Sequence, residues 1–188
     1  GILFEWLPLI ANSIRTSGDA VLSHTPSATG NRKAFTKSDV KKAMTKFNRE
    51  NVPMTGRYLL IDADMYDQLL ASLTAQEAMA FHAAVDVKNG IVGALYGFNI
   101  MMRSRVAVYA TAGTKKAWST AGAAADNAAA LAWHTNSVCR ALGEVVAREQ
   151  LNSPQYYGDI YAFEVRAGGR AMRNDVKGLT AIIQDTAS

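Results

Sequence analysis

Cysteine is almost missing from this sequence, which has a single one, Cys139, among 188 residues. One thiol cannot form an internal disulfide, and it cannot supply the ligands of a cysteine-based zinc knuckle. We therefore expect a fold held together by its core, in a reducing compartment.

Long apolar runs and a strong charge of one sign are also missing. The apolar stretch at residues 2–10 is interrupted by Glu5 and Pro8, and a membrane-spanning helix needs roughly 18 uninterrupted residues. The net charge is only +4, with a pI near 9.2. We expect no membrane contact, and we find no dense basic stripe of the kind that announces a nucleic-acid-binding domain.

Signatures of catalysis and of cofactor binding are weak. Cys139 and His134 are close in sequence, and a small hydrolase using this pair is the enzymatic alternative. No protease or transferase motif surrounds Cys139, and its apolar neighbours favour a buried cysteine on a packed helix. No serine lies in a Gly-x-Ser-x-Gly elbow. We predict that the protein is not an enzyme and has no catalytic residues.

Cofactor and metal motifs fail on spacing. Gly93 and Gly97 lack the Lys-Ser/Thr of a phosphate loop and the third glycine of a dinucleotide fingerprint. The acidic residues Asp62, Asp64 and Asp67 lack the spacing and glycine of a calcium loop, so helix capping is the better interpretation. We predict no cofactor and no metal site.

The most informative stretch runs from Asn51 to Leu73. Pro53 ends the preceding basic helix, and residues 57–61 are too apolar and too short for a surface helix, so they predict a buried strand. Asp62 or Asp64 can then cap a helix that continues to Leu73.

The remaining chain predicts an α+β fold. We expect helices over residues 2–22, from the capping box at 36–39 to about 51, from the capping box at 74–77 to about 85, and from 136 or 137 through 145. We expect strands at 98–103, 106–109, 131–134, 159–166 and 179–184, with a bend at Gly168-Gly169 and an exposed loop over about 110–130.

Charge is unevenly distributed along the chain. Residues 31–60 carry eight basic and two acidic side chains, whereas residues 61–100 carry five acidic side chains and Lys88. Opposite charges on neighbouring segments suit a chain that docks on copies of itself. Two separately solvated faces explain the same pattern.

The order of segments resembles a known family. The basic helix followed by "Asn-Val-Pro…Gly-Arg-Tyr-Leu-Leu-Ile-Asp…Tyr…Leu-Leu", and the later "Gly-Ile-Val-Gly…Tyr-Gly-Phe-Asn-Ile…Arg-Ser", are similar to the major capsid proteins of tailed bacteriophages with the Hong Kong 97-like fold. The resemblance runs from about Ile2 onward, and the N-terminal arm and extended loop of that family would precede it. Because the chain starts at Gly1 without methionine, we expect a processed or truncated N-terminus.

The resemblance implies a peripheral domain at residues 1–55 and 159–188, with a long spine helix and long antiparallel strands. It also implies an axial domain at 56–158, with a central sheet flanked by helices. The expected function is a virion shell subunit, assembled in the host cytoplasm into hexamers and pentamers around double-stranded DNA. Portal, scaffolding or decoration proteins are further expected partners, and packaged DNA would be met through non-specific charge.

Three alternatives remain at this point: an encapsulin-like nanocompartment shell, the Cys139/His134 hydrolase, and a basic nucleic-acid-binding module. For the capsid interpretation we predict that basic side chains and the exposed loop meet neighbouring subunits. The predicted subunit-interface residues are Lys37, Lys41, Lys42, Lys46, Arg57, Lys115, Lys116, Trp118, Arg166, Arg170 and Arg173.

Overall fold

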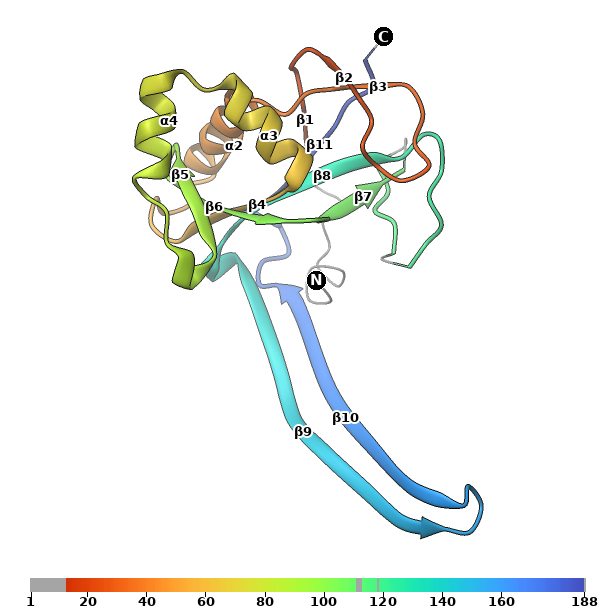
Figure 1. Ribbon diagram of the computed structural model, residues 1–188. Coiled ribbons are helices and arrows are strands. Elements are labelled where there is room, and N and C mark those ends of the chain that lie inside the picture. Colours follow the sequence, from red (N-terminus) through yellow and green to blue (C-terminus); the bar gives the residue numbers. More distant parts are fainter. Residues whose placement is uncertain (1–12, 111–112, 118, 188) are drawn as a thin grey trace.

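A mixed sheet of seven strands runs through the body of the molecule (Figure 1). The computed structural model describes residues 13–110, 113–117 and 119–187. The path of the sheet is β1-β11-β8-β4-β6-β5, and β7 also pairs with β8. Its strands are β1 (Ser13–Arg15), β4 (Arg57–Asp62), β5 (Ile91–Leu95), β6 (Phe98–Arg103), β7 (Ala107–Tyr109), β8 (Asn127–His134) and β11 (Leu179–Ile183). The β1–β11 and β4–β6 pairs are parallel and the others antiparallel.

Three helices lie against one face of this sheet among the described residues, namely α2 (Lys37–Arg49), α3 (Ala63–Ser72) and α4 (Ala75–His82) (Figure 1). All three begin where the sequence predicts. The Asp62 side chain caps α3 by accepting a hydrogen bond of 2.7 Å from the backbone N–H of Met65. Thr74 and Glu77 form the expected capping box at α4. In the described ranges no helix has the length and apolar character needed to cross a bilayer.

Strand β8 shows why the sheet is buried on both faces. Its alanines at 128, 130 and 132 belong to the hydrophobic cluster beneath the helices, with Phe47 of α2 and Leu59 of β4. Ala129 and Leu131 point to a second cluster with Leu179 and Ile183 of β11. Small side chains on alternate positions let the backbones and helices approach closely, so an alanine-rich segment here forms a core strand.

This strand corrects the loop predicted over about 110–130. Residues 127–130 are buried in β8, whereas 113–117 and 119–126 are mostly turns and irregular chain. Composition failed here because alanine is depleted in strands, and only the tertiary context makes an alanine-rich strand favourable.

A long antiparallel hairpin, β9 (Val138–Ser153) and β10 (Gly158–Ala171), projects away from the body (Figure 1). The helix expected from 136 or 137 through Val145 is therefore wrong; a short 3-10 turn, Thr135–Ser137, leads directly into β9. Gly143 and the β-branched pair Val145-Val146 disfavour a helix, and pairing with β10 decides the outcome. A register shift between Val165 and Ala167 lies just before the predicted bend at the glycines. We call this hairpin the arm.

Two further expectations are corrected. Of the helix predicted over 2–22, residues 2–12 lie outside the described residues, and the rest contains β1 and β2 (Ala20–Leu22), which pairs with β3 (Asn31–Lys33). The last two predicted strands do not pair with each other. Strand β10 pairs with β9, and β11 enters the sheet between β1 and β8.

Candidate subunit interface

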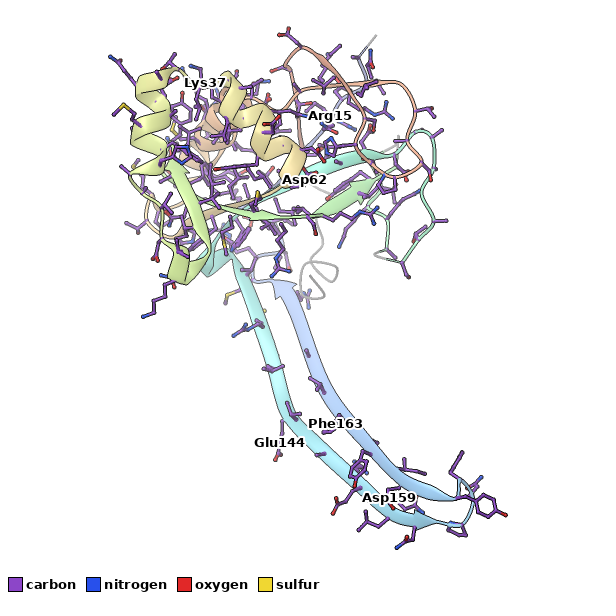
Figure 2. The ribbon with its side chains drawn as sticks, viewed as in Figure 1. Arg15, Lys37, Asp62, Glu144, Asp159 and Phe163 are labelled. Atoms are coloured by element: carbon purple, nitrogen blue, oxygen red, sulfur yellow. The ribbon has the colours of Figure 1, made fainter. Side chains whose placement is uncertain are left out.

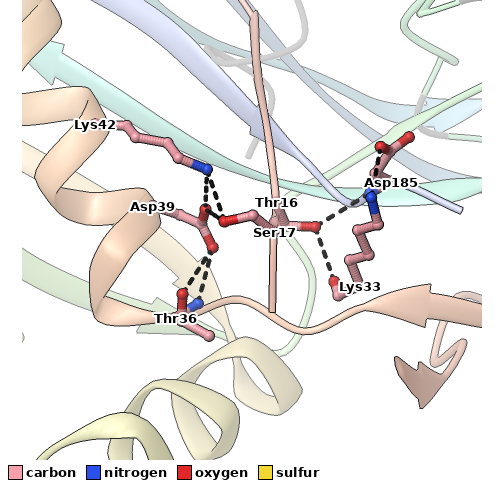
Figure 3. A network of polar contacts seen from close by, with 7 residues as sticks. All are labelled: Thr16, Ser17, Lys33, Thr36, Asp39, Lys42 and Asp185. Carbon is pink, nitrogen blue, oxygen red and sulfur yellow. Dashed lines mark hydrogen bonds and ion pairs between the residues drawn. The ribbon is translucent and has the colours of Figure 1, made fainter. Parts of the chain in front are cut away.

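The basic face of α2 keeps two exposed lysines, Lys41 and Lys42. Lys42 is held in place, because its Nζ lies 3.0 Å from the buried carboxylate of Asp39 and donates to Ser17 Oγ at 2.7 Å (Figure 3). In the same network Asp185 N donates to Thr16 Oγ1 at 3.1 Å. The Lys42 ammonium is thus held in a defined position by Asp39 and Ser17.

Two other lysines of α2 that were predicted at the subunit interface, Lys37 and Lys46, make contacts within the chain. Lys46 is half-buried, and its Nζ lies 3.4 Å from Thr180 Oγ1 of β11; burial lowers its pKa. Lys37 Nζ forms an ion pair of 2.7 Å with Glu77 of α4. This hydrogen bond, together with those from Thr74, lowers the pKa of Glu77 to about 2.

Arg57 is not a surface residue, and its assignment to the interface is wrong. Only 1% of it is exposed, and its guanidinium lies 5.6 Å and 5.9 Å from the ring centroids of Phe47 and Phe98. Its nitrogens donate to the carbonyls of Val52 (2.6 Å) and Pro53 (2.8 Å) and to Asn48 Oδ1 at 2.8 Å. The side chain fastens the turn between α2 and β4, so its role is in the fold.

In the segment before β8, Lys116 is also tied down, while Trp118 lies outside the described residues. Lys116 Nζ lies 2.8 Å from the buried carboxylate of Asp126. Burial acts to raise the pKa of Asp126, but hydrogen bonds from Lys116 and Ala123 and the charges of Lys116 and Arg32 leave it below its ordinary value. Lys115 is half-buried at the cavity described below.

The C-terminal arginines lie on the arm and on the turn after it. Arg166 and Arg170 are exposed on β10, and Arg166 is paired with Glu164 at 2.7 Å. Arg173 forms an ion pair of 2.7 Å with Asp175, and this bond lowers the pKa of Asp175 to about 2. The structure brings Lys41 and Lys42 together on one helix and Arg166 and Arg170 together on one strand.

The most conspicuous surface was not among the predicted interface residues. Cross-strand partners share a face of a hairpin, and Val145 lies opposite Val165 while Phe163 lies opposite Ala147. Tyr161, which pairs with Glu149, and Leu151, two residues further along β9, follow on the same side by strand alternation; Figure 2 labels Phe163 on the arm. Each of these large apolar side chains is more than half exposed, and Phe163 reaches 73%. We call Val145, Leu151, Tyr161, Phe163 and Val165 the apolar arm face.

The other side of the arm is mixed, since Ile160 lies opposite Gln150, Ala162 opposite Arg148 and Val146 opposite Glu164. Arg148 and Arg166 both form ion pairs with Glu164, at 3.1 Å and 2.7 Å. The sequence carried a partial signal for the apolar arm face, since residues 163–166 alternate in polarity. It was missed as a surface because an alternating strand normally places its apolar side in its own core.

The catalytic alternative finds no support in the geometry of its two residues. Cys139 is exposed on β9 and its Sγ lies 3.3 Å from the carbonyl of Arg170, so the buried cysteine on a packed helix is wrong. Both ring nitrogens of His134 are engaged: Nε2 donates to the carbonyl of Thr55 at 2.8 Å, and Nδ1 accepts from Asn136 N at 3.1 Å. His134 therefore has no free nitrogen to act as a base toward Cys139.

The fold is that of phage capsid structures. The capsid of Ralstonia phage GP4 aligns with a TM-score of 0.61 at 15% identity, covering 96% of this chain and 54% of that one. A structure from Mycobacterium phage Che8 aligns at 0.55 and 17% identity, covering 96% and 56%. The capsid of Cyanophage P-SCSP1u aligns at 0.50 and 16% identity, covering 92% and 52%. The sequence matches no protein-family model and no curated protein.

These likenesses define a class by its fold: a mixed α+β protein with a phage capsid-like fold. The chain spans a little over half the length of each structure it resembles. At these sequence identities the likeness concerns the fold alone.

Proposed function

We propose that this chain is a subunit of a major capsid protein of the Hong Kong 97-like type, which self-assembles into the hexamers and pentamers of an icosahedral phage head around double-stranded DNA. The observation that carries the proposal is the arm: a two-stranded hairpin that leaves the body and exposes an apolar face. The capsid-like fold supports the proposal, because a neighbouring subunit in a capsid would cover such a face.

An arm of this kind needs a partner to be stable. A lone two-stranded hairpin is marginal in water, and its five large apolar side chains expose on the order of 400–500 Å². That is comparable with the largest apolar patch of a typical monomer and about half of one partner's share of a standard interface. Burying it contributes roughly 10 kcal/mol before the cost of association, which is itself about 4–15 kcal/mol. Several such contacts per subunit are therefore required, as in a closed shell.

Identical subunits in rings meet head to tail, so the surface that covers the apolar arm face is a different part of the neighbouring copy. Charged side chains at such a contact determine how the two subunits align more than how tightly they bind. We propose Lys41, Arg166 and Arg170 as the exposed basic contacts, because these side chains remain on the surface. Packaged DNA, portal, scaffolding and decoration proteins are further partners of the proposed shell.

The division into a peripheral part (1–55 and 159–188) and an axial part (56–158) stays a prediction, because those parts are defined by their position in a shell. Within one chain, segments of both parts share a sheet, since β1 and β11 lie beside β8 and β4. The arm likewise takes β9 from one part and β10 from the other.

The proposal is tested by placing a charge on the apolar arm face. In Phe163→Glu we expect at least a tenfold weaker association, because about 2 kcal/mol of apolar burial is lost and a carboxylate is desolvated. Ala162→Glu is the matched control, because Ala162 is adjacent, also exposed, and on the opposite side of the arm, across from Arg148. Sedimentation velocity and negative-stain microscopy of the whole chain give the readouts.

If both variants assemble like the unmodified chain, the arm face is not a subunit contact. If the unmodified chain forms neither rings nor shells at any concentration or ionic strength, the capsid assignment itself is refuted. A Lys41→Glu variant that assembles normally would remove α2 from the contact set while leaving the arm contact in place.

A further inference from the structure

Three side chains with metal-ligand chemistry converge where α3 begins. His24 comes from the chain between β2 and β3, Asp62 ends β4, and Asp64 lies in the first turn of α3. His24 Nε2 lies 2.9 Å from Asp62 Oδ2, and one ligand atom from each of the three residues falls within 4.8 Å of the others. They line a cavity of about 260 Å³.

Charges of both signs line this cavity. They are the carboxylates of Asp62, Asp64 and Asp126 and the basic side chains of Arg105, Lys115 and Lys116, of which Lys116 is paired with Asp126. The Asp62 side chain is only 7% exposed, and its Oδ1 is used by Met65 N, which leaves Oδ2 toward His24. Asp64 adds a second carboxylate from the exposed side. The positive end of the α3 dipole, about half an elementary charge, offsets two carboxylates only in part. A cation bound at this point of the cavity would accept one nitrogen and two oxygens.

A second observation points to a ligand in the same place. Thr25 lines the cavity, is 6% exposed, and its hydroxyl has no hydrogen-bond partner among the described residues. His24 Nδ1 is likewise buried without a partner there. Buried polar groups are normally satisfied, so unsatisfied ones beside a cavity indicate a ligand or ordered solvent.

We infer that His24, Asp62 and Asp64 form a binding site for a divalent first-row transition ion, with Zn²⁺ as the fitting probe. Imidazole with carboxylates is a set that such ions accept, at bond lengths of about 2.0–2.2 Å. Ligand atoms around a tetrahedral ion stand roughly 3.3–3.6 Å apart, so His24 Nε2 and Asp62 Oδ2, which are now 2.9 Å apart, would separate slightly by side-chain rotation when the ion binds. The ion would tie the segment between β2 and β3 to the start of α3. This inference is independent of the proposed capsid function.

The test is isothermal titration of the whole chain with Zn²⁺, accompanied by NMR of the histidine rings. We expect one saturable site, with the ring signals of His24 shifted and those of His82 unchanged. His24→Asn and Asp64→Asn should each weaken binding at least tenfold. The matched controls are His82→Asn, an exposed histidine on α4, and Asp67→Asn, an exposed aspartate on α3; both should keep the affinity of the unmodified chain.

Absence of saturable binding would overturn the inference. So would equal weakening by His82→Asn and His24→Asn, since that result would identify adventitious binding by surface imidazoles. Asp64 is exposed and is not the N-cap of α3, which is Asp62, so Asp64→Asn should fold normally by circular dichroism even if His24→Asn does not. An Asp64→Asn variant that folds and binds Zn²⁺ with unchanged affinity would also refute the site.

Discussion

Replacing Arg57 by alanine should be among the most destabilising single changes in the body of this protein. The substitution removes three hydrogen bonds from a charged donor and leaves three oxygens, two of them main-chain carbonyls, without that donor. It also removes the cation from its place near the rings of Phe47 and Phe98. Hydrogen bonds to charged groups contribute about 1.5–3 kcal/mol each, and the cation–π contacts about 1 kcal/mol.

These contributions are not additive, and water can reach some of the freed oxygens, so we expect a loss of about 3–5 kcal/mol in the free energy of unfolding. Urea denaturation at pH 7, followed by circular dichroism and tryptophan fluorescence, measures it. Arg57→Lys should lose roughly half as much, because one ammonium cannot reach all three acceptors. Arg49→Ala is the control. This exposed arginine ends α2, just before the same turn, and its replacement should change the free energy of unfolding by less than about 0.5 kcal/mol. A loss below about 1 kcal/mol in Arg57→Ala would refute the assigned role.

Three further changes test other parts of the fold. Gly93→Ala should cost about 1–3 kcal/mol by urea denaturation, because a Cβ there would lie 2.4 Å from the Phe81 ring, whereas Gly168→Ala, with open space around it, should be neutral or stabilising. The pKa of Asp126 is lower in the folded protein than in the unfolded chain, so this carboxylate stabilises the fold above about pH 4, and the stabilisation is lost as the pH falls through the folded-state pKa. In Asp126→Asn the free energy of unfolding should therefore fall less steeply between about pH 5 and pH 2. A slope equal to that of the unmodified protein would contradict this assignment. Thr74→Ala should cost about 0.5–2 kcal/mol by removing the α4 capping box, and a neutral result in thermal denaturation would show that the box is dispensable.

Local sequence signals correctly predict the segment from the end of α2 to the start of α3. Pro53, the apolar run at 57–61 and the acid at 62 gave the end of α2, strand β4 and the start of α3 correctly, because each depends on neighbours a few residues away. The capping box at 74–77 worked for the same reason. These are interactions in which propensity and the final fold agree.

The failures come from partners that are distant in sequence. Residues 138–145 were predicted as a helix, and they are a strand because residues 165–171 pair with them. Arg57 was assigned to the surface by its charge, and its burial depends on rings contributed by α2 and β6. The meeting of His24 with Asp62, separated by 38 positions, left no pattern in the sequence. Pairing across such distances is decided by topology rather than by composition.

The placement of β11 has a consequence for how the molecule is made. This strand is fully buried between β1 and β8, although it follows both of them in the chain. While the ribosome is still synthesising residues 138–178, the edge of β8 that β11 will occupy has no partner, and the core beneath it is open. The body can close only after Leu179–Ile183 have left the ribosome, so the sheet and the core on both of its faces stay incomplete until the whole arm has been synthesised.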